Sequence, residues 1–319
     1  MDNHRDMAKT KPAVDTSDSP GLYPIRTLSS LTGVNSVTLR AWERRYNLIR
    51  PQRTAKGHRL YTQRDVERIQ QVLVYINQGI AISQVKPLLD GTATVPAPPP
   101  QAGQSDEWER YCTRMQNAIE RFDEQALDAA YNDALSLYPA DLVIRRLATP
   151  VLRELGERWK ERPAGVAEEH FFSVYLRNRL GARLLHLNAQ EHGPRLLMSC
   201  LPGEQHEIGM LFFALAAVSH GYRLVLFGAN LPLEQIPPAL EQRPCDAVVL
   251  SGSARPAHGL FDELLPALVK QIDVPVFVGG GITARHAAAI DRTGAIAVGQ
   301  EFQAALARIA ERLDARKRR

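Results

Sequence analysis

Three residues in one short stretch, Glu204, His206 and Gly209, have the types and spacing of a ligand-binding loop. An apolar run at 195–201 precedes the stretch, and an apolar helix pattern at 208–220 follows it. The histidine is therefore expected between a first strand and a first helix, at the carboxyl end of the strand, where open parallel sheets bind ligands. The hexapeptide alone is equally compatible with a loop histidine that caps a helix, because short motifs also arise by chance.

The spacing E-x-H-x-x-G resembles the D-x-H-x-x-G signature of cobalamin-binding domains. Two further features of that family follow in order, a serine-rich turn after a strand at 247–250 and a glycine run after a strand at 274–278. The residues concerned are Ser251, Ser253, Gly279, Gly280 and Gly281.

This resemblance implies cobalamin as the cofactor and a role for each motif. His206 would ligate cobalt in place of the cofactor's own base, and Glu204 would orient its ring by accepting from the other nitrogen. Gly209 would let the corrin approach the backbone. The serines would bond the buried nucleotide tail, and the glycine run would leave the space that the tail fills.

The elements that must position this loop follow from the alternation of strands and helices after residue 193. Strands are expected at about 195–201, 223–228, 247–251, 274–279 and 295–298, with a closing helix at 300–316. Such alternation predicts a doubly wound, parallel five-stranded α/β sheet with helices on both faces. Residues 193–319 are therefore expected to form a Rossmann-like cobalamin-binding domain.

Residues 105–192 show helical periodicity throughout, broken near Pro139 and at 163–165, which predicts a four-helix bundle. Trp159, Glu169 and His170 lie in this region, and their W-x9-E-H spacing resembles light-sensing cobalamin-dependent repressors of the CarH and LitR type. The resemblance implies that the bundle caps the upper corrin face and that these three residues line the pocket of an adenosyl group. A core tryptophan beside a surface Glu-His pair is the alternative.

Positive charge is concentrated in one segment of the chain. Residues 22–80 carry ten lysines and arginines but three acids, a net charge of +7 in a chain whose formal net charge is +4. This asymmetry indicates a polyanionic partner for one domain. The segment also predicts two short helices around Gly33, a basic hairpin at 51–61 and a helix from Asp65, the pattern of a winged helix-turn-helix.

The sequence L-R-A-W-E-R-R-Y at 39–46, followed by R-P at 50–51 and G-H-R-L-Y at 57–61, resembles the winged-helix DNA-binding domain of MerR-type transcription regulators. The resemblance covers residues 22–90 and implies binding to double-stranded promoter DNA, in which phosphate contacts position the domain and few side chains read bases. The expected contacts lie on the recognition helix and the wing: Thr38, Arg40, Arg44, Arg45, Arg53, His58, Arg59 and Tyr61. Trp42 is expected in the core.

A proline-rich linker is expected at 91–104 and a disordered tail at 1–21. The linker prolines interrupt any long coiled coil of the kind through which many MerR-type regulators pair. Assembly into a homo-oligomer, a dimer or a tetramer, is therefore expected through the C-terminal domains.

Bulk properties exclude several classes of protein. No apolar run approaches the roughly 20 residues that span a bilayer, and the polar N-terminus is unlike a signal peptide. The 3 cysteines are far apart and form no C-x-x-C pair, so neither a disulfide framework nor a zinc site is indicated. The chain is expected to be cytoplasmic and not an enzyme.

The sequence departs from the light-sensing family at one position, so it does not decide which signal the protein senses. In the best-known branch of the light-sensing family a histidine follows the bundle tryptophan, whereas here the position is Lys160. A lysine amine ligates only when deprotonated. The protein could therefore sense light, cobalamin level, or a partner regulator. A regulator with a degenerate cobalamin domain and a corrinoid methyltransferase subunit are the alternatives. Operator sequence, target genes and sign of regulation are not encoded in any readable pattern.

Overall fold

The computed structural model describes residues 22–54, 57–92, 102–158, 162–253 and 255–317. The chain divides into two compact units. The first contains residues up to Thr113 together with Ala129–Val143, and the second contains Arg114–Asp128 and Ile144–Arg319. The tail at 1–21 and most of the expected linker lie outside the described residues.

The N-terminal part is a winged helix-turn-helix, as the sequence predicts. Gly33 ends the first helix in the left-handed conformation, and the side chain of Asn35 accepts from the backbone N–H of Thr38 to cap the second. A three-stranded antiparallel sheet in the order β1-β3-β2 forms the wing. The elements are β1 (Leu22–Pro24), α1 (Ile25–Thr32), α2 (Ser36–Ala41), η1 (Trp42–Tyr46), β2 (Gln52–Arg53), β3 (Arg59–Thr62), α3 (Gln63–Asn77) and α4 (Ile82–Leu89).

Helices occupy the middle of the chain, with breaks where the sequence places Pro139 and Pro163. The capping aspartate Asp123 accepts from the backbone N–H of Ala126 at the turn between the first two. The helices are α5 (Ala102–Glu120), α6 (Glu124–Leu137), α7 (Ala140–Val143), η2 (Ile144–Ala148), α8 (Thr149–Arg158) and α9 (Gly165–Asn188). None of the described helices is long and apolar enough to cross a membrane.

The C-terminal part is a five-stranded sheet in the order β5-β4-β6-β7-β8, and every pair is parallel. The strands are β4 (Arg195–Cys200), β5 (Arg223–Gly228), β6 (Ala247–Ser251), β7 (Val276–Gly279) and β8 (Ile296–Gly299). The helices between and after them are α10 (Ile208–Ser219), α11 (Ile236–Gln242), α12 (Leu265–Gln271), α13 (Thr283–Arg292) and α14 (Phe302–Lys317).

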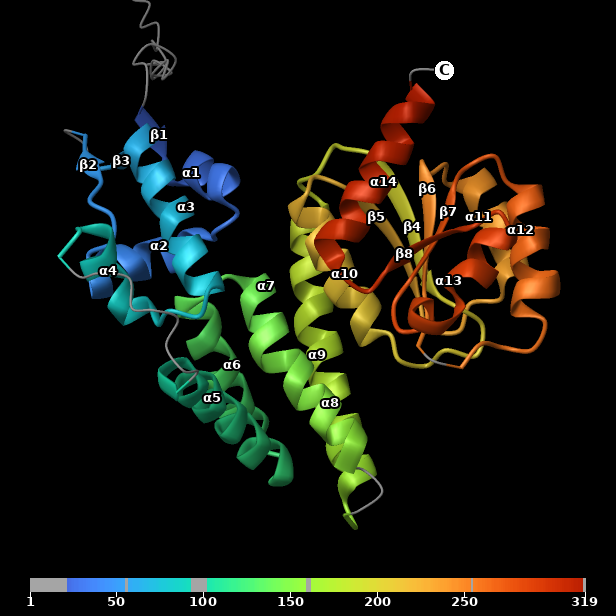
Figure 1. Ribbon diagram of the computed structural model, residues 1–319, viewed down its shortest axis with the longest axis horizontal. Coiled ribbons are helices and arrows are strands. Elements are labelled where there is room, and N and C mark those ends of the chain that lie inside the picture. Colours follow the sequence, from blue (N-terminus) through green and yellow to red (C-terminus); the bar gives the residue numbers. More distant parts are fainter. Residues whose placement is uncertain (1–21, 55–56, 93–101, 159–161, 254, 318–319) are drawn as a thin grey trace, which may run out of the picture. The chain divides into compact units, whose positions relative to one another are not determined.

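Figure 1 shows α10 and α14 on one face of this sheet and α11, α12 and α13 on the other. The predicted doubly wound parallel fold is thus confirmed. The strand order reverses between β4 and β6, because the chain leaves β4 in one direction to form β5 and returns past it to form β6. The crevice at the carboxyl ends of these two strands is where folds of this class bind ligands.

Candidate functional site

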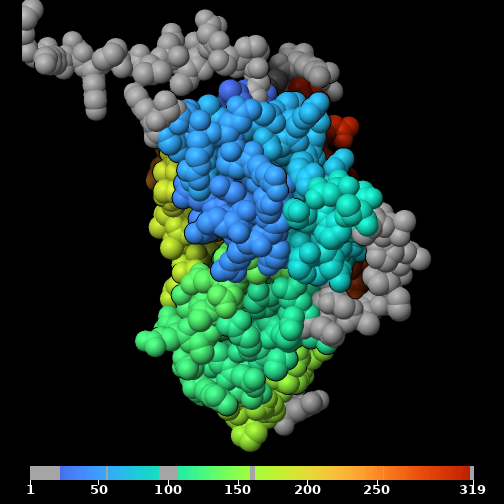
Figure 2. All heavy atoms as spheres, turned by 90° about the vertical axis from the view of Figure 1, so that its left-hand side faces the viewer, coloured from blue at the N-terminus to red at the C-terminus, as the bar shows by residue number. Residues whose placement is uncertain are grey.

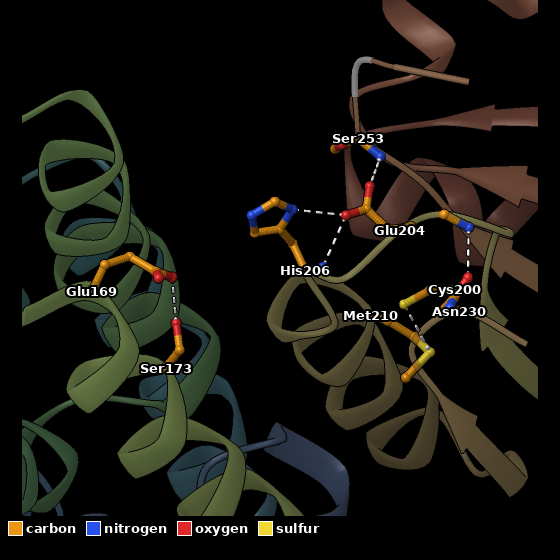
Figure 3. A network of polar contacts seen from close by, with 9 residues as sticks. Glu169, Ser173, Cys200, Glu204, His206, Met210, Asn230 and Ser253 are labelled. Atoms are coloured by element: carbon orange, nitrogen blue, oxygen red, sulfur yellow. Dashed lines mark hydrogen bonds and ion pairs between the residues drawn. The ribbon is translucent and has the colours of Figure 1, made fainter. Parts of the chain in front are cut away.

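A buried carboxylate holds His206 on the loop between β4 and α10. The Oε1 atom of Glu204 accepts hydrogen bonds from the backbone N–H and the ring Nδ1 of His206, both at 2.8 Å. Its Oε2 atom accepts a third, from the backbone N–H of Ser253 at 2.5 Å. Figure 3 shows these three contacts converging on Glu204. The imidazole is therefore oriented although 77% of the histidine side chain is exposed.

These contacts determine which ring nitrogen of His206 is free to bind a ligand. An ionised carboxylate only accepts, so Nδ1 carries the proton and Nε2 of the neutral ring keeps a lone pair. Burial alone would raise the pKa of Glu204, but hydrogen bonds from Ser253 and His206 outweigh burial and hold the pKa below its usual value. Glu204 is thus an anion at neutral pH, and His206 presents one neutral nitrogen of the kind that ligates metals.

A cavity of about 850 Å³ lies beside His206 at the carboxyl ends of the strands. The predicted residues that line it are His206, Gly209, Ser251, Ser253, Gly279, Gly280 and Gly281. The structure thus brings into one cavity three motifs that are distant in the sequence.

Two glycines of this wall differ in the space around them. Gly280 has a φ of +92°, and a Cβ atom there would lie 2.5 Å from the carbonyl oxygen of Gly252. Gly209, in contrast, has nothing within 4 Å of the place where a Cβ would be. Its missing side chain leaves open space next to His206, which suits close approach by a large flat ligand.

A second cavity, of about 680 Å³, opens on the other side of the same loop, toward α8 and α9. Glu169 and His170 line it together with His206, as the resemblance implies. Glu169 accepts a hydrogen bond from the Oγ of Ser173 at 2.7 Å, and its other oxygen lies 3.0 Å from the Nδ1 of His170. Trp159 and Lys160 lie outside the described residues, so the predicted packing of Trp159 stays a prediction.

Sequence reasoning missed several residues of the cavity walls. Ser173 and Arg177 line the second cavity, and Arg177 also donates to the carboxylate of Glu207, next to the ligating loop. Both could have been found, since they follow Glu169 at intervals of four and share its helix face. Gly156 of α8, which lines both cavities, was also missed.

Basic side chains are exposed along η1 and the wing. Exposed among the predicted DNA contacts are Arg40, Arg44, Arg45, Arg53 and His58. Arg59 is only partly exposed, because its Nε donates to the carboxylate of Glu43 at 2.8 Å. The Nη2 of Arg53 lies 3.9 Å from the same carboxylate, so Glu43 ties both wing arginines to the recognition helix, while Arg40, Arg44 and Arg45 stay exposed.

Two predicted DNA contacts must be corrected, because the structure buries both side chains completely. Thr38 lies on the face of α2 that packs against α6, and its hydroxyl donates to the carbonyl of Leu135 at 3.1 Å. Tyr61 lies on β3, the central strand of the wing sheet, with its ring in the domain core, where burial raises the pKa of its hydroxyl. Neither side chain can reach DNA in this structure.

The carboxyl end of α6 receives a second donor from the winged helix. The indole Nε1 of Trp42 donates to the carbonyl of Leu137 at 2.8 Å in a fully buried contact. Helix ends leave their last carbonyls without partners inside the helix, and Thr38 and Trp42 satisfy two of them here. Figure 2 shows the outer surface of the winged helix in blue and cyan. Thr38, Trp42, Leu135 and Leu137 belong to the same compact unit.

Comparison with known families agrees with this architecture. The family described as "MerR HTH family regulatory protein" matches residues 23–92. Two families described as "B12 binding domain" match residues 111–184 and 194–310. The matches cover the winged helix, the helices that carry Glu169 and His170, and the sheet domain that carries His206.

Two relatives match this chain over most of their length. The HTH-type transcriptional repressor CarH of Myxococcus xanthus is 32% identical over 280 residues, which cover 85% of this chain and 92% of that protein. The HTH-type transcriptional repressor CarA of Myxococcus xanthus is 31% identical, over 85% of this chain and 91% of that protein.

Among solved structures, the monomethylamine corrinoid protein of Methanosarcina barkeri matches with a TM-score of 0.50 and 18% identity. The match covers 63% of this chain and 97% of that one, and it shows a shared fold. The winged helix and the sheet domain match these families, and both relatives match over nearly their whole length. The chain therefore belongs to the MerR-type transcription regulators that carry a cobalamin-binding domain.

Proposed function

We propose that this regulator binds adenosylcobalamin, and that the bound cofactor controls its oligomeric state and its binding to promoter DNA, with light as the signal. The observation that carries the proposal is the position of His206. Glu204 holds its ring at Nδ1, which leaves Nε2 free at the meeting point of two cavities, one at the sheet and one toward α8 and α9. A cofactor with a nucleotide tail on one side of a metal and a large group on the other would need this arrangement.

In this proposal the residues that line the two cavities bind different parts of the cofactor. Bound adenosylcobalamin supplies a cobalt–carbon bond that light can break. His206 holds the cobalt, while Ser251 and the glycines at 279–281 accommodate the tail. Glu169 and His170 present hydrogen-bonding groups to the opposite side. Contacts with α8 and α9 then depend on what fills the second cavity, which gives the cofactor a way to bias the conformation of the helices.

Assembly through the C-terminal domains would bring several winged helices onto one promoter. The exposed arginines Arg40, Arg44 and Arg45 support phosphate contact by each copy. Promoter affinity would then follow the oligomeric state, because linked binding domains engage DNA far more tightly than a single domain does.

The test is to load the purified full chain with adenosylcobalamin in the dark and then illuminate it. We expect a protein-bound corrin spectrum that changes with light, a smaller particle by size-exclusion chromatography after illumination, and weaker promoter binding. His206→Ala should weaken cobalamin binding or alter the spectrum. His192→Ala, which removes an exposed histidine remote from the loop, serves as the matched control and should behave like the wild type.

Two results would contradict the proposal in different ways. A colourless protein that cannot be loaded would indicate a regulator with a degenerate cobalamin domain. A protein that binds cobalamin but keeps the same size and promoter affinity in light and dark would respond to cobalamin level or to a partner regulator.

The second of these outcomes is the runner-up function, because Lys160 stands where a related branch has a histidine. His170 is the candidate replacement, since it lines the same cavity as His206. If His170 performs this task, His170→Ala should change the spectrum of the illuminated protein while leaving the dark spectrum unchanged.

A further inference from the structure

Only three of the residues that the structure describes line both cavities: His206, Gly209 and Gly156. His206 and Gly209 belong to the ligating loop and its helix. Gly156 lies across from them on α8. Leu152 and Arg153, one turn earlier on the same face of α8, line the second and the first cavity respectively.

Glycine at position 156 is costly for the helix and has no use in its packing. Glycine is among the least favourable residues for a helix, because its backbone loses the most conformational freedom. Its backbone does not have the positive φ that would require glycine. Among the described residues, a Cβ at position 156 would meet nothing within 4 Å, so none of them packs closely enough to require glycine. Gly209 has the same open space at its Cβ position.

We propose that Gly156 sets the size of the group that the protein accepts on the α8 side of His206. The missing side chain keeps open the passage between the two cavities. A cobalamin whose upper group is a nucleoside needs that passage, whereas one whose upper group is water or hydroxide does not. The inference rests on the proposed cofactor and goes beyond it, because it assigns discrimination between forms of cobalamin to one residue.

The experiment compares Gly156→Ala and Gly156→Leu with the wild type in dark titrations with adenosylcobalamin and, separately, hydroxocobalamin. Binding is followed by the corrin absorbance and by calorimetry on the full chain. Leucine forms helices far better than glycine, so the substituted apo protein should unfold at the same temperature as the wild type or higher. Gly181→Leu is the matched control, since Gly181 lies inside α9 with the same open space but lines neither cavity.

Overfilling a site generally costs enough to weaken binding by about tenfold or more, so we expect that loss for adenosylcobalamin with Gly156→Leu. The alanine variant should lie between the wild type and leucine. Hydroxocobalamin binding should change by no more than about twofold, the range of a neutral surface substitution. Gly181→Leu should leave both titrations unchanged.

Equal weakening of both cobalamins by Gly156→Leu would overturn the inference, because position 156 would then obstruct the corrin itself. Unchanged binding of both would overturn it as well. In either case a wild type that binds cobalamin leaves the proposed function standing. A wild type that binds neither form would instead overturn the proposed function, and the inference with it.

Discussion

Glu204 illustrates how a single buried carboxylate can prepare a ligand. It accepts from Nδ1 of His206 and from two backbone N–H groups, so a glutamine there would turn its amide NH₂ toward a donor. Glu204→Gln should weaken cobalamin binding by about 10- to 100-fold, the usual effect of losing a partner that orients a metal ligand. Spectroscopic titration measures the loss. Glu234→Gln, at an exposed position, should have no effect and controls for the lost charge.

The same residue gives the stability of the protein a predictable dependence on pH. The pKa of Glu204 is lower in the folded chain than its unfolded value of about 4.3. Its stabilising contribution is therefore complete above that value and is lost as pH falls through the lower, folded pKa. Denaturant unfolding between about pH 3 and 6 should show a smaller acid-induced loss in Glu204→Gln than in wild type. An equal acid-induced loss of stability in the two proteins would contradict this prediction.

At the residue scale the sequence predicts which residues line the first cavity better than which side chains of the winged helix are exposed. His206, Ser251 and the glycines at 279–281 each lie at or after the carboxyl end of an apolar strand, and parallel strands bring such ends together. Thr38 and Tyr61 could not be assigned in this way. The helical periodicity of the sequence places Thr38 on a polar face of α2, but it does not show that α6 covers that face. Tyr61 follows a glycine turn like an exposed wing residue, yet its strand is central in its sheet.

At the scale of elements, the end of α6 is held by side chains from the recognition helix. Trp42→Phe replaces the indole with a smaller aromatic ring and removes its N–H, which leaves the buried carbonyl of Leu137 unsatisfied. We expect the free energy of unfolding to fall by about 1 to 3 kcal/mol. Urea denaturation measures it. Ser136→Ala, which removes an exposed hydroxyl at the same helix end, should cost less than about 0.5 kcal/mol.

Strand and helix positions are predicted closely where apolar runs end in glycine, serine or proline, as at β6 and β7. Neither the order of the strands in the sheet nor the second cavity can be predicted from such local patterns. They depend on which strands pair and on how α8 and α9 pack beside the sheet domain, and both are long-range contacts that no local period specifies. The contact of Trp42 with α6 belongs to the same class.

For the whole molecule, the uneven charge makes DNA affinity sensitive to salt. Arg44→Ala should weaken promoter binding and reduce the slope of log affinity against log salt by about 1, because it removes one exposed cation that can neutralise a phosphate. Fluorescence anisotropy over a salt series measures both quantities. Arg292→Ala, an exposed charge in the cobalamin-binding part, is the control. A slope unchanged by Arg44→Ala would exclude that side chain from phosphate contact.

The docking of Thr38 and Trp42 on α6 limits how this regulator can be rebuilt for new promoters. An engineered chimera that grafts a foreign winged helix onto the sensor half would strip the carbonyls of Leu135 and Leu137 of their donors. Retargeting should therefore keep this hydroxyl and this indole and vary the exposed arginines alone. The part that can be changed for a new promoter is therefore the exposed arginine-bearing surface and not the whole winged-helix domain.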